Sequence, residues 1–92
     1  MFWKWPEAPD LGAEGWARVR MVEVAAGREL PIHPAPADVL VVCVAGTIRF
    51  LADGEERDLG PGDGVALRAG APHAIRAGDG GRVLLILRQE EP

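Results

Sequence analysis

The chain has 92 residues, which predicts a single domain near the lower size limit for independent folding. Its hydrophobic fraction of 48% and charged fraction of 26% are typical of a globular protein and exclude a disordered one. The formal net charge is −4, with 10 basic against 14 acidic side chains and no basic cluster, which argues against binding to nucleic acid or to an anionic membrane.

The only cysteine, Cys43, excludes an intramolecular disulfide and favours a reducing compartment. The N-terminal sequence MFWKWPEAPD lacks the apolar core of a secretion signal. The longest apolar run, from Val39 to Ala45, is too short to cross a bilayer. We therefore expect a soluble, cytoplasmic protein.

The N-terminal segment differs in character from the rest of the chain. All three tryptophans, Trp3, Trp5 and Trp16, precede the regular strand pattern. In FWKW, the alternation of an extended strand places Trp3 and Trp5 on one face and Lys4 on the other. Residues 1–18 are expected to form a Trp-rich segment that either covers the edge of the protein's own sheet or lies as an arm on a second subunit.

Clusters of glycine and proline divide the remaining chain into short runs rich in Val, Ile, Leu and Phe. Between two such runs, the dipeptide Asp53-Gly54 is a strong β-hairpin signal. No useful window has a helical period, and many short strands between turns predict an all-β sandwich or barrel. Strands are expected at residues 17–24, 30–33, 38–45, 47–52, 55–59, 65–68, 73–77 and 82–89.

The alternation of side chains predicts which faces are buried. In TIRFLA, Ile48 and Phe50 point to one side, and Arg49 points to the other. The segments VLVVCV and VLLIL do not alternate. Strands that are apolar on both faces lie inside a sandwich or beneath a partner subunit.

The spacing of glycines and histidines resembles the two sequence motifs of the cupin superfamily. Gly27, five residues, His33, and then Gly46 match the frame of the first motif. The PGD turn at residues 61–63, followed by Gly70 and His73, is similar to the second motif. The resemblance covers about residues 19–90 and implies a cupin domain over residues 19–92. It also implies a double-stranded β-helix, or jelly-roll barrel.

In cupins, the motif histidines and a glutamate hold a divalent metal inside the barrel. The resemblance assigns His33 and His73 to the first and last histidine positions, but Ala35 stands at the second histidine position and Val39 at the glutamate position. Two further departures are Arg68 in place of a proline and Ala77 in place of an asparagine. Because alanine and valine offer no lone pair, the resemblance implies a degenerate metal site, and a bound divalent transition metal is not favoured.

A non-standard third metal ligand remains an alternative. Asp38 lies one residue before the glutamate position, so that only a β-bulge would turn its carboxylate inward. Cys43 shares strand parity with Val39 and offers a soft ligand deeper in the barrel, although a buried free cysteine usually packs as a small hydrophobe.

Strand parity predicts an apolar pocket with two imidazoles. Such a pocket suits a small ligand with one or two hydrogen-bonding groups. No Ser-His-Asp pattern or zinc-type cysteine spacing is present, and no catalytic residue is assigned. The predicted lining residues are His33, Ala35, Val39, Val41, Cys43, His73, Ile75 and Ala77.

Three functional hypotheses follow. The favoured one is a homodimeric cupin-fold protein that binds a small molecule and has no robust catalytic activity. The second is a metal-dependent enzyme, similar to the cupin dioxygenases and isomerases, in which His33 and His73 hold the metal with Asp38 or Cys43. The third is a structural or interaction module. The chain carries no helix-turn-helix region of its own, so a role on DNA would need a partner protein.

Overall fold

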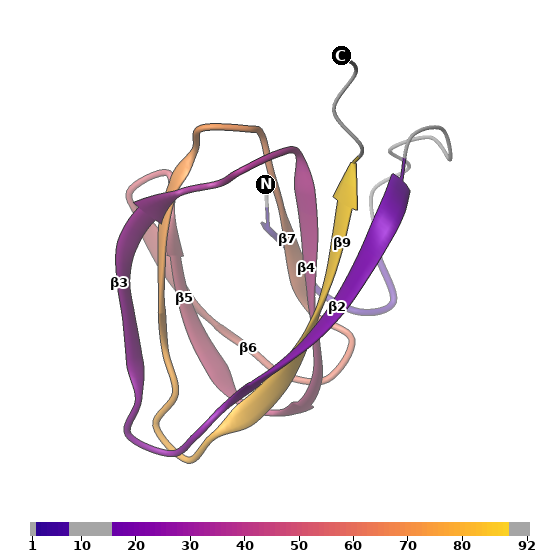
Figure 1. The fold of residues 1–92 in the computed structure, drawn as a ribbon. Helices are drawn as coiled ribbons and strands as arrows, with labels where there is room; N and C mark the ends of the chain where they lie inside the picture. Colours follow the sequence, from indigo (N-terminus) through magenta and orange to yellow (C-terminus); the bar gives the residue numbers. More distant parts are fainter. Residues whose placement is uncertain (1, 8–15, 89–92) are drawn as a thin grey trace.

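The computed structural model describes residues 2–7 and 16–88, and it consists of two antiparallel sheets that face each other (Figure 1). The first sheet has the strand order β1-β7-β4-β9-β2, and the second has the order β3-β8-β5-β6. The predicted all-β jelly-roll barrel is confirmed. The strands are β1 (Phe2–Trp3), β2 (Trp16–Val24), β3 (Glu29–Pro34), β4 (Val39–Gly46), β5 (Ile48–Ala52), β6 (Glu55–Leu59), β7 (Gly64–Leu67), β8 (Pro72–Arg76) and β9 (Gly81–Arg88).

The predicted strands agree with the observed ones to within about one residue at each end, and β1 is an additional strand. The strand predicted at residues 65–68 ends at Leu67, because the chain turns there: the Ala71 amide donates to the Arg68 carbonyl. Residue 89, the last of the final predicted strand, lies outside the described residues. Within residues 2–7 and 16–88, no helix is long and apolar enough to cross a membrane.

The core lies between the two sheets, where the alternation in the sequence predicts it. In β5, Ile48 and Phe50 are completely buried, whereas Arg49 is exposed. Val65 in β7 and Val83 in β9 complete the opposite wall and are also completely buried. Two small sheets that each turn an apolar face inward therefore suffice to enclose a continuous core.

The doubly apolar strands β4 and β9 contribute only one face to this core. Val41 and Cys43 of β4 point inward and are buried, whereas Leu40 and Val42 point outward and are half-buried. The prediction that these strands lie inside the sandwich thus holds for one face. No layer of the described residues 2–7 and 16–88 covers the other face.

The N-terminal residues pair with β7. Phe2 lies opposite Val65 and Trp3 lies opposite Gly64. The predicted extended segment is shorter than expected, because residues 4–7 form a turn in which the Glu7 amide donates to the Lys4 carbonyl. Residues 8–15 lie outside the described part, so the boundary between residues 1–18 and 19–92 stays a prediction.

The motif glycine Gly46 ends β4 with a φ of +71°, a conformation that side-chain-bearing residues rarely adopt. A Cβ atom at this position would also come within 2.8 Å of the Gly81 Cα atom and still closer to the Gly80 carbonyl oxygen. The strands β4 and β9 can approach at this end of the barrel only because the residue is glycine.

Candidate functional site

The two histidines of the chain lie directly opposite each other in the ladder between β3 and β8. Residues that face each other across antiparallel strands project from the same side of the sheet. The ring centroids of His33 and His73 are 4.1 Å apart, and the ring planes are inclined by 60°. The fold therefore brings both imidazoles into one site.

The pair extends from the core to the surface. His73 is buried, with 8% of its surface exposed, and its ring stacks on that of Phe50 with a centroid separation of 5.8 Å and an interplanar angle of 1°. His33 is exposed. A ligand from solvent would therefore meet His33 first, while Phe50 and the core hold His73 in place.

Each imidazole is tied to the backbone of its own strand. The Nδ1 atom of His33 lies 2.9 Å from the carbonyl oxygen of Pro31, and that of His73 lies 3.1 Å from the carbonyl oxygen of Ala71. A carbonyl oxygen only accepts hydrogen bonds, so the proton of the neutral ring belongs on Nδ1, which donates it. Both Nε2 atoms then carry a free lone pair, which can accept a hydrogen bond or bind a metal.

Burial favours the neutral form of His73. Removal from water lowers the pKa of its imidazole, and this effect outweighs the hydrogen bond to the Ala71 carbonyl, which raises the pKa; the neighbouring His33 adds a smaller lowering. Because a lowered pKa keeps the ring uncharged at neutral pH, its Nε2 lone pair stays available.

The residues that were predicted to form an apolar lining are all buried in one hydrophobic cluster, and they belong to the core. Ala35 is tied to the histidine end of the barrel, because its amide donates to the Ala71 carbonyl, whereas the Ala77 amide bonds to Arg28 at the other end of β8. Three surface hollows, of about 530, 350 and 180 Å³, are lined by neither histidine. That these residues line a ligand pocket stays a prediction. The six buried residues are Ala35, Val39, Val41, Cys43, Ile75 and Ala77.

The two candidates for a third metal ligand are engaged elsewhere. Asp38 accepts a hydrogen bond of 2.9 Å from the Ala69 amide through Oδ1, and its Oδ2 lies 3.5 Å from Nη1 of Arg88. The Cys43 thiol is completely buried, its Sγ lies 3.4 Å from the Ala45 carbonyl oxygen, and burial raises its pKa.

The donor set does not fit a tightly held resident metal. No three His, Cys, Asp or Glu side chains in the described part of the chain are placed to hold a metal ion. Even catalytic zinc sites, which leave one position open, use three protein ligands. Two imidazoles alone fall short of this number.

Sequence reasoning missed the residues that support the histidines. The inward direction of Phe50 was predictable from its strand, but its stacking on His73 depends on the pairing of β5 with β8. The roles of Pro31 and Ala71 rest on backbone carbonyls, which leave no signal in the amino-acid type.

Comparison with known proteins defines the class. The family model described as "Cupin domain" matches residues 20–87, and the chain belongs to this family. The chain is 40% identical over 68 residues to the dimethylsulfoniopropionate lyase DddQ of Ruegeria pomeroyi. This match covers 73% of the chain but 34% of the lyase, so the chain spans about a third of the length of that relative.

Solved structures show the same fold. The crystal structure of DddQ from Ruegeria pomeroyi matches with a TM-score of 0.73 and 36% identity over 78% of this chain and 38% of that chain. A protein of unknown function from Streptococcus pyogenes matches with a TM-score of 0.73 and 26% identity, covering 80% of this chain and 65% of its own. A cupin 2 conserved barrel domain protein from Leptotrichia buccalis matches with a TM-score of 0.71 and 30% identity, covering 77% of this chain and 35% of its own.

Proposed function

We propose that this cupin domain binds a small molecule at His33 and His73 and has no robust catalytic activity of its own. The observation that supports the proposal is the pairing of two imidazoles whose Nδ1 atoms are both held by backbone carbonyls. The two Nε2 atoms are then fixed acceptors on neighbouring rings. The free thiol of Cys43 suits a reducing compartment, and we place this role in the cytoplasm.

The chemistry of the site selects a ligand that donates hydrogen bonds. Two acceptors on rings whose centroids are 4.1 Å apart suit a molecule with two adjacent hydroxyl or amine groups on an apolar body. An anionic ligand without donors is disfavoured, because the Nε2 lone pair of the buried, uncharged His73 repels it. The polar end of the ligand would lie against the exposed His33, with the buried His73 as the second acceptor.

Catechol and its dimethyl ether, 1,2-dimethoxybenzene, form a matched pair of probes. Both have the same apolar ring, but only catechol donates hydrogen bonds. We expect catechol to shift the imidazole ¹⁵N resonances of both histidines in a saturable titration, and the dimethyl ether to leave them unchanged. His33→Phe keeps a ring and removes an acceptor, so it should weaken catechol binding about tenfold, the loss of roughly one hydrogen bond. Ile32→Phe, a ring added at the exposed neighbouring residue, is the control.

The proposal fails if neither probe shifts the histidine signals, or if both do so equally. In the first case the metal-dependent enzyme and the structural or interaction module remain as candidates, because the histidine pair then accepts no hydrogen bonds from the probe. In the second, the site selects for the ring alone, and the Nε2 acceptors have no role.

A metal-dependent enzyme is the second candidate, and the resemblance to a dimethylsulfoniopropionate lyase favours a catalytic role. In that case His33 and His73 would bind the metal with a third ligand other than Asp38 and Cys43, because these two side chains are engaged elsewhere. Elemental analysis of protein purified without an affinity tag, together with consumption of dimethylsulfoniopropionate followed by NMR, tests this candidate. Stoichiometric metal that is lost in His33→Ala/His73→Ala would support the enzyme over the binding protein.

We also propose that the protein acts as a homodimer. A 92-residue domain buries a smaller fraction of its surface than a larger domain does, and the strands β4 and β9 carry more apolar surface than the barrel encloses.

A further inference from the structure

The short N-terminal strand β1 adds an aromatic ring to the interior of the barrel. Phe2 lies opposite the completely buried Val65 in the ladder with β7, so its side chain shares the inward face. It is half-buried and packs against the core. Trp3, the other residue of β1, lies opposite Gly64 and points to the outer face. The strand therefore places one ring inside the barrel and one on its surface.

Phe2 is connected to the histidine pair through Phe50. The ring centroids of Phe2 and Phe50 are 6.2 Å apart and the ring planes are inclined by 81°, which is the edge-to-face arrangement that aromatic pairs favour. Phe50 in turn stacks on His73, whose ring faces that of His33. Four rings thus form a continuous series of contacts from the N-terminal strand to the exposed imidazole.

Arg57 contacts the ring of Phe2 as well. It lies opposite Phe50 in the ladder between β5 and β6, so the two side chains share one face of their sheet. The Cζ atom of Arg57 is 5.1 Å from the centroid of the Phe2 ring, which is a cation–π distance. An ion pair of 2.8 Å with Glu55 orients the guanidinium. Phe2 is therefore held by two side chains of the other sheet.

Glycines before and within β7 make room for the N-terminal segment. A Cβ atom at Gly64 would overlap the ring of Trp3 and lie 2.7 Å from its Cη2 atom. A Cβ atom at Gly62 would lie 2.9 Å from the Cβ atom of Trp5. Between these glycines, the Asp63 carboxylate accepts a hydrogen bond from the Trp5 amide. The segment is therefore seated closely on the barrel, although β1 pairs with β7 through only two residues.

We propose that Phe2 is a positioning residue of the histidine site and acts on His73 through Phe50. The Ala71 carbonyl holds the His73 ring at Nδ1, but this one contact does not fix the plane of the ring. The stacked ring of Phe50 fixes the plane, and with it the direction of Nε2. Because protein interiors are close-packed, loss of the Phe2 ring would leave space into which Phe50 can tilt. The inference rests on the ligand site proposed above and adds the N-terminal strand to it.

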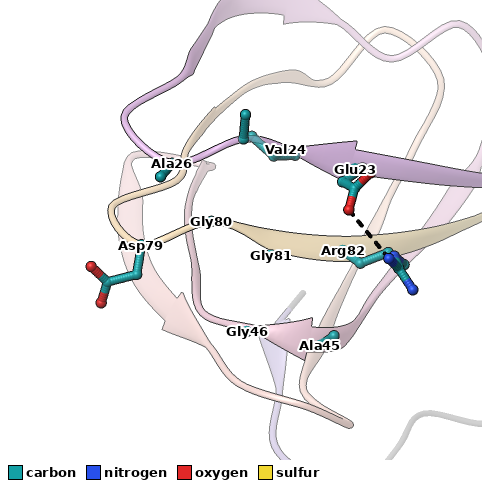
Figure 2. A pocket seen from close by; sticks show the side chains of 10 residues that line it. Glu23, Val24, Ala26, Ala45, Gly46, Asp79, Gly80, Gly81 and Arg82 are labelled. Carbon is teal, nitrogen blue, oxygen red and sulfur yellow. Dashed lines mark hydrogen bonds and ion pairs between the residues drawn. The ribbon is translucent and has the colours of Figure 1, made fainter.

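The largest hollow of the described surface lies apart from these rings. It has a volume of about 530 Å³, lies at the Gly46 end of β4 and is lined by none of the four rings (Figure 2). The backbone of Gly80 and Gly81 forms part of its wall. The amide resonances of these two glycines therefore report a probe that binds away from the histidines.

Phe2→Leu tests the inference, because leucine keeps an apolar side chain and removes the ring. Val22→Ala is the matched control: Val22 lies on β2 at the other edge of the same sheet and is half-buried against the same core. Without ligand, NMR measures the ring-proton shifts of His73, which depend on the position of the Phe50 ring. We expect Phe2→Leu to change these shifts and to weaken the NOE contacts between the two rings, and Val22→Ala to retain both. Circular dichroism verifies that each variant folds.

Catechol titrations measure the effect on binding. Phe2→Leu should bind catechol about two- to tenfold more weakly than the wild type, the contribution of one aromatic pair, whereas Val22→Ala should bind it as the wild type does. Unchanged His73 ring shifts in Phe2→Leu, or an equal change in Val22→Ala, would overturn the inference. If Phe2→Leu does not fold, Phe2→Met takes its place with the same expected and contradicting results, because the flexible methionine fills more of the space of the ring.

The two measurements separate this inference from the proposed function. If the wild type does not bind catechol, or if only the Gly80 and Gly81 amides respond, the proposed function fails, and the ligand-free His73 ring shifts alone decide the role of Phe2. If catechol binds to the wild type and to Phe2→Leu with equal affinity, the role of Phe2 fails and the proposed function stands.

Discussion

His33 and His73 face each other across two antiparallel strands, with their ring centroids 4.1 Å apart, and only one of the two rings is buried. The buried ring rests on Phe50, and the exposed ring meets solvent. The backbone carbonyls that hold Nδ1 of each ring leave both Nε2 atoms as acceptors. This arrangement keeps the histidines of the cupin motifs but not a full set of metal ligands.

The burial of His73 should make stability depend on pH. Its pKa is lowered by desolvation and by His33, so that as the pH falls the unfolded chain binds the proton before the folded chain does. The free energy of unfolding should therefore be at its full value above about pH 6.5 and decline as the pH falls through the unfolded and then the folded pKa. Urea unfolding between pH 8 and 5.5 measures this slope. His73→Phe should flatten it, and an unchanged slope in this variant would contradict the assignment.

Gly46→Ala should destabilise the barrel by about 2–4 kcal/mol, because the alanine would need a positive φ and its Cβ would collide with the backbone of Gly80 and Gly81. Gly27 also has a positive φ, but a Cβ at this position would meet no atom within 4 Å, so Gly27→Ala should cost only about 1 kcal/mol. Gly78→Ala, with neither feature, should stay within about 0.5 kcal/mol of the wild type. Equal losses in all three variants, measured by urea unfolding, would refute this explanation.

Asp63 ties the N-terminal turn to the barrel. Its carboxylate accepts 3.0 Å hydrogen bonds from the amides of Trp5 and Gly60, which together with Lys4 lower its pKa. Asp63→Ala should cost about 1–3 kcal/mol, because two backbone donors lose their acceptor. Asp58→Ala, which removes only an exposed ion pair, should cost less than about 1 kcal/mol.

The same carboxylate should contribute to acid sensitivity. Because the folded pKa of Asp63 is lowered, its contribution to stability is complete above the unfolded pKa of about 3.9 and is lost as the pH falls through the folded pKa. Tryptophan fluorescence during acid titration follows this loss. Below pH 4, the stability of Asp63→Ala should depend less on pH than that of the wild type. An identical pH dependence would contradict the contribution of the Asp63 carboxylate to acid sensitivity.

The Cys43 thiol should be unreactive in the folded protein. It is completely buried, and burial raises its pKa, so that little thiolate forms and the reagent cannot reach it. We expect modification by 5,5′-dithiobis(2-nitrobenzoic acid) at pH 8 to be at least about 100-fold slower in buffer than in 6 M guanidinium chloride. A folded protein that reacts as fast as the denatured chain would show that the thiol is accessible.

The sequence by itself determined the strand pattern and the buried faces. Alternation in β5 requires Ile48 and Phe50 to share a side, and the Asp53-Gly54 turn sets the hairpin between β5 and β6. The motif glycine Gly46 stands where the structure has a φ of +71°. These features are local, because strand period and turn chemistry depend on residues that are close together in the chain.

Only the tertiary structure decided how distant residues meet. It set His33 against His73, placed Phe50 beneath the second ring and engaged Asp38 with Ala69 and Arg88. Among residues 2–7 and 16–88, it also left the outer faces of β4 and β9 without a covering layer. These contacts depend on the pairing and register of strands that are far apart in sequence. The packing of the whole barrel determines this pairing and register, and no local pattern does.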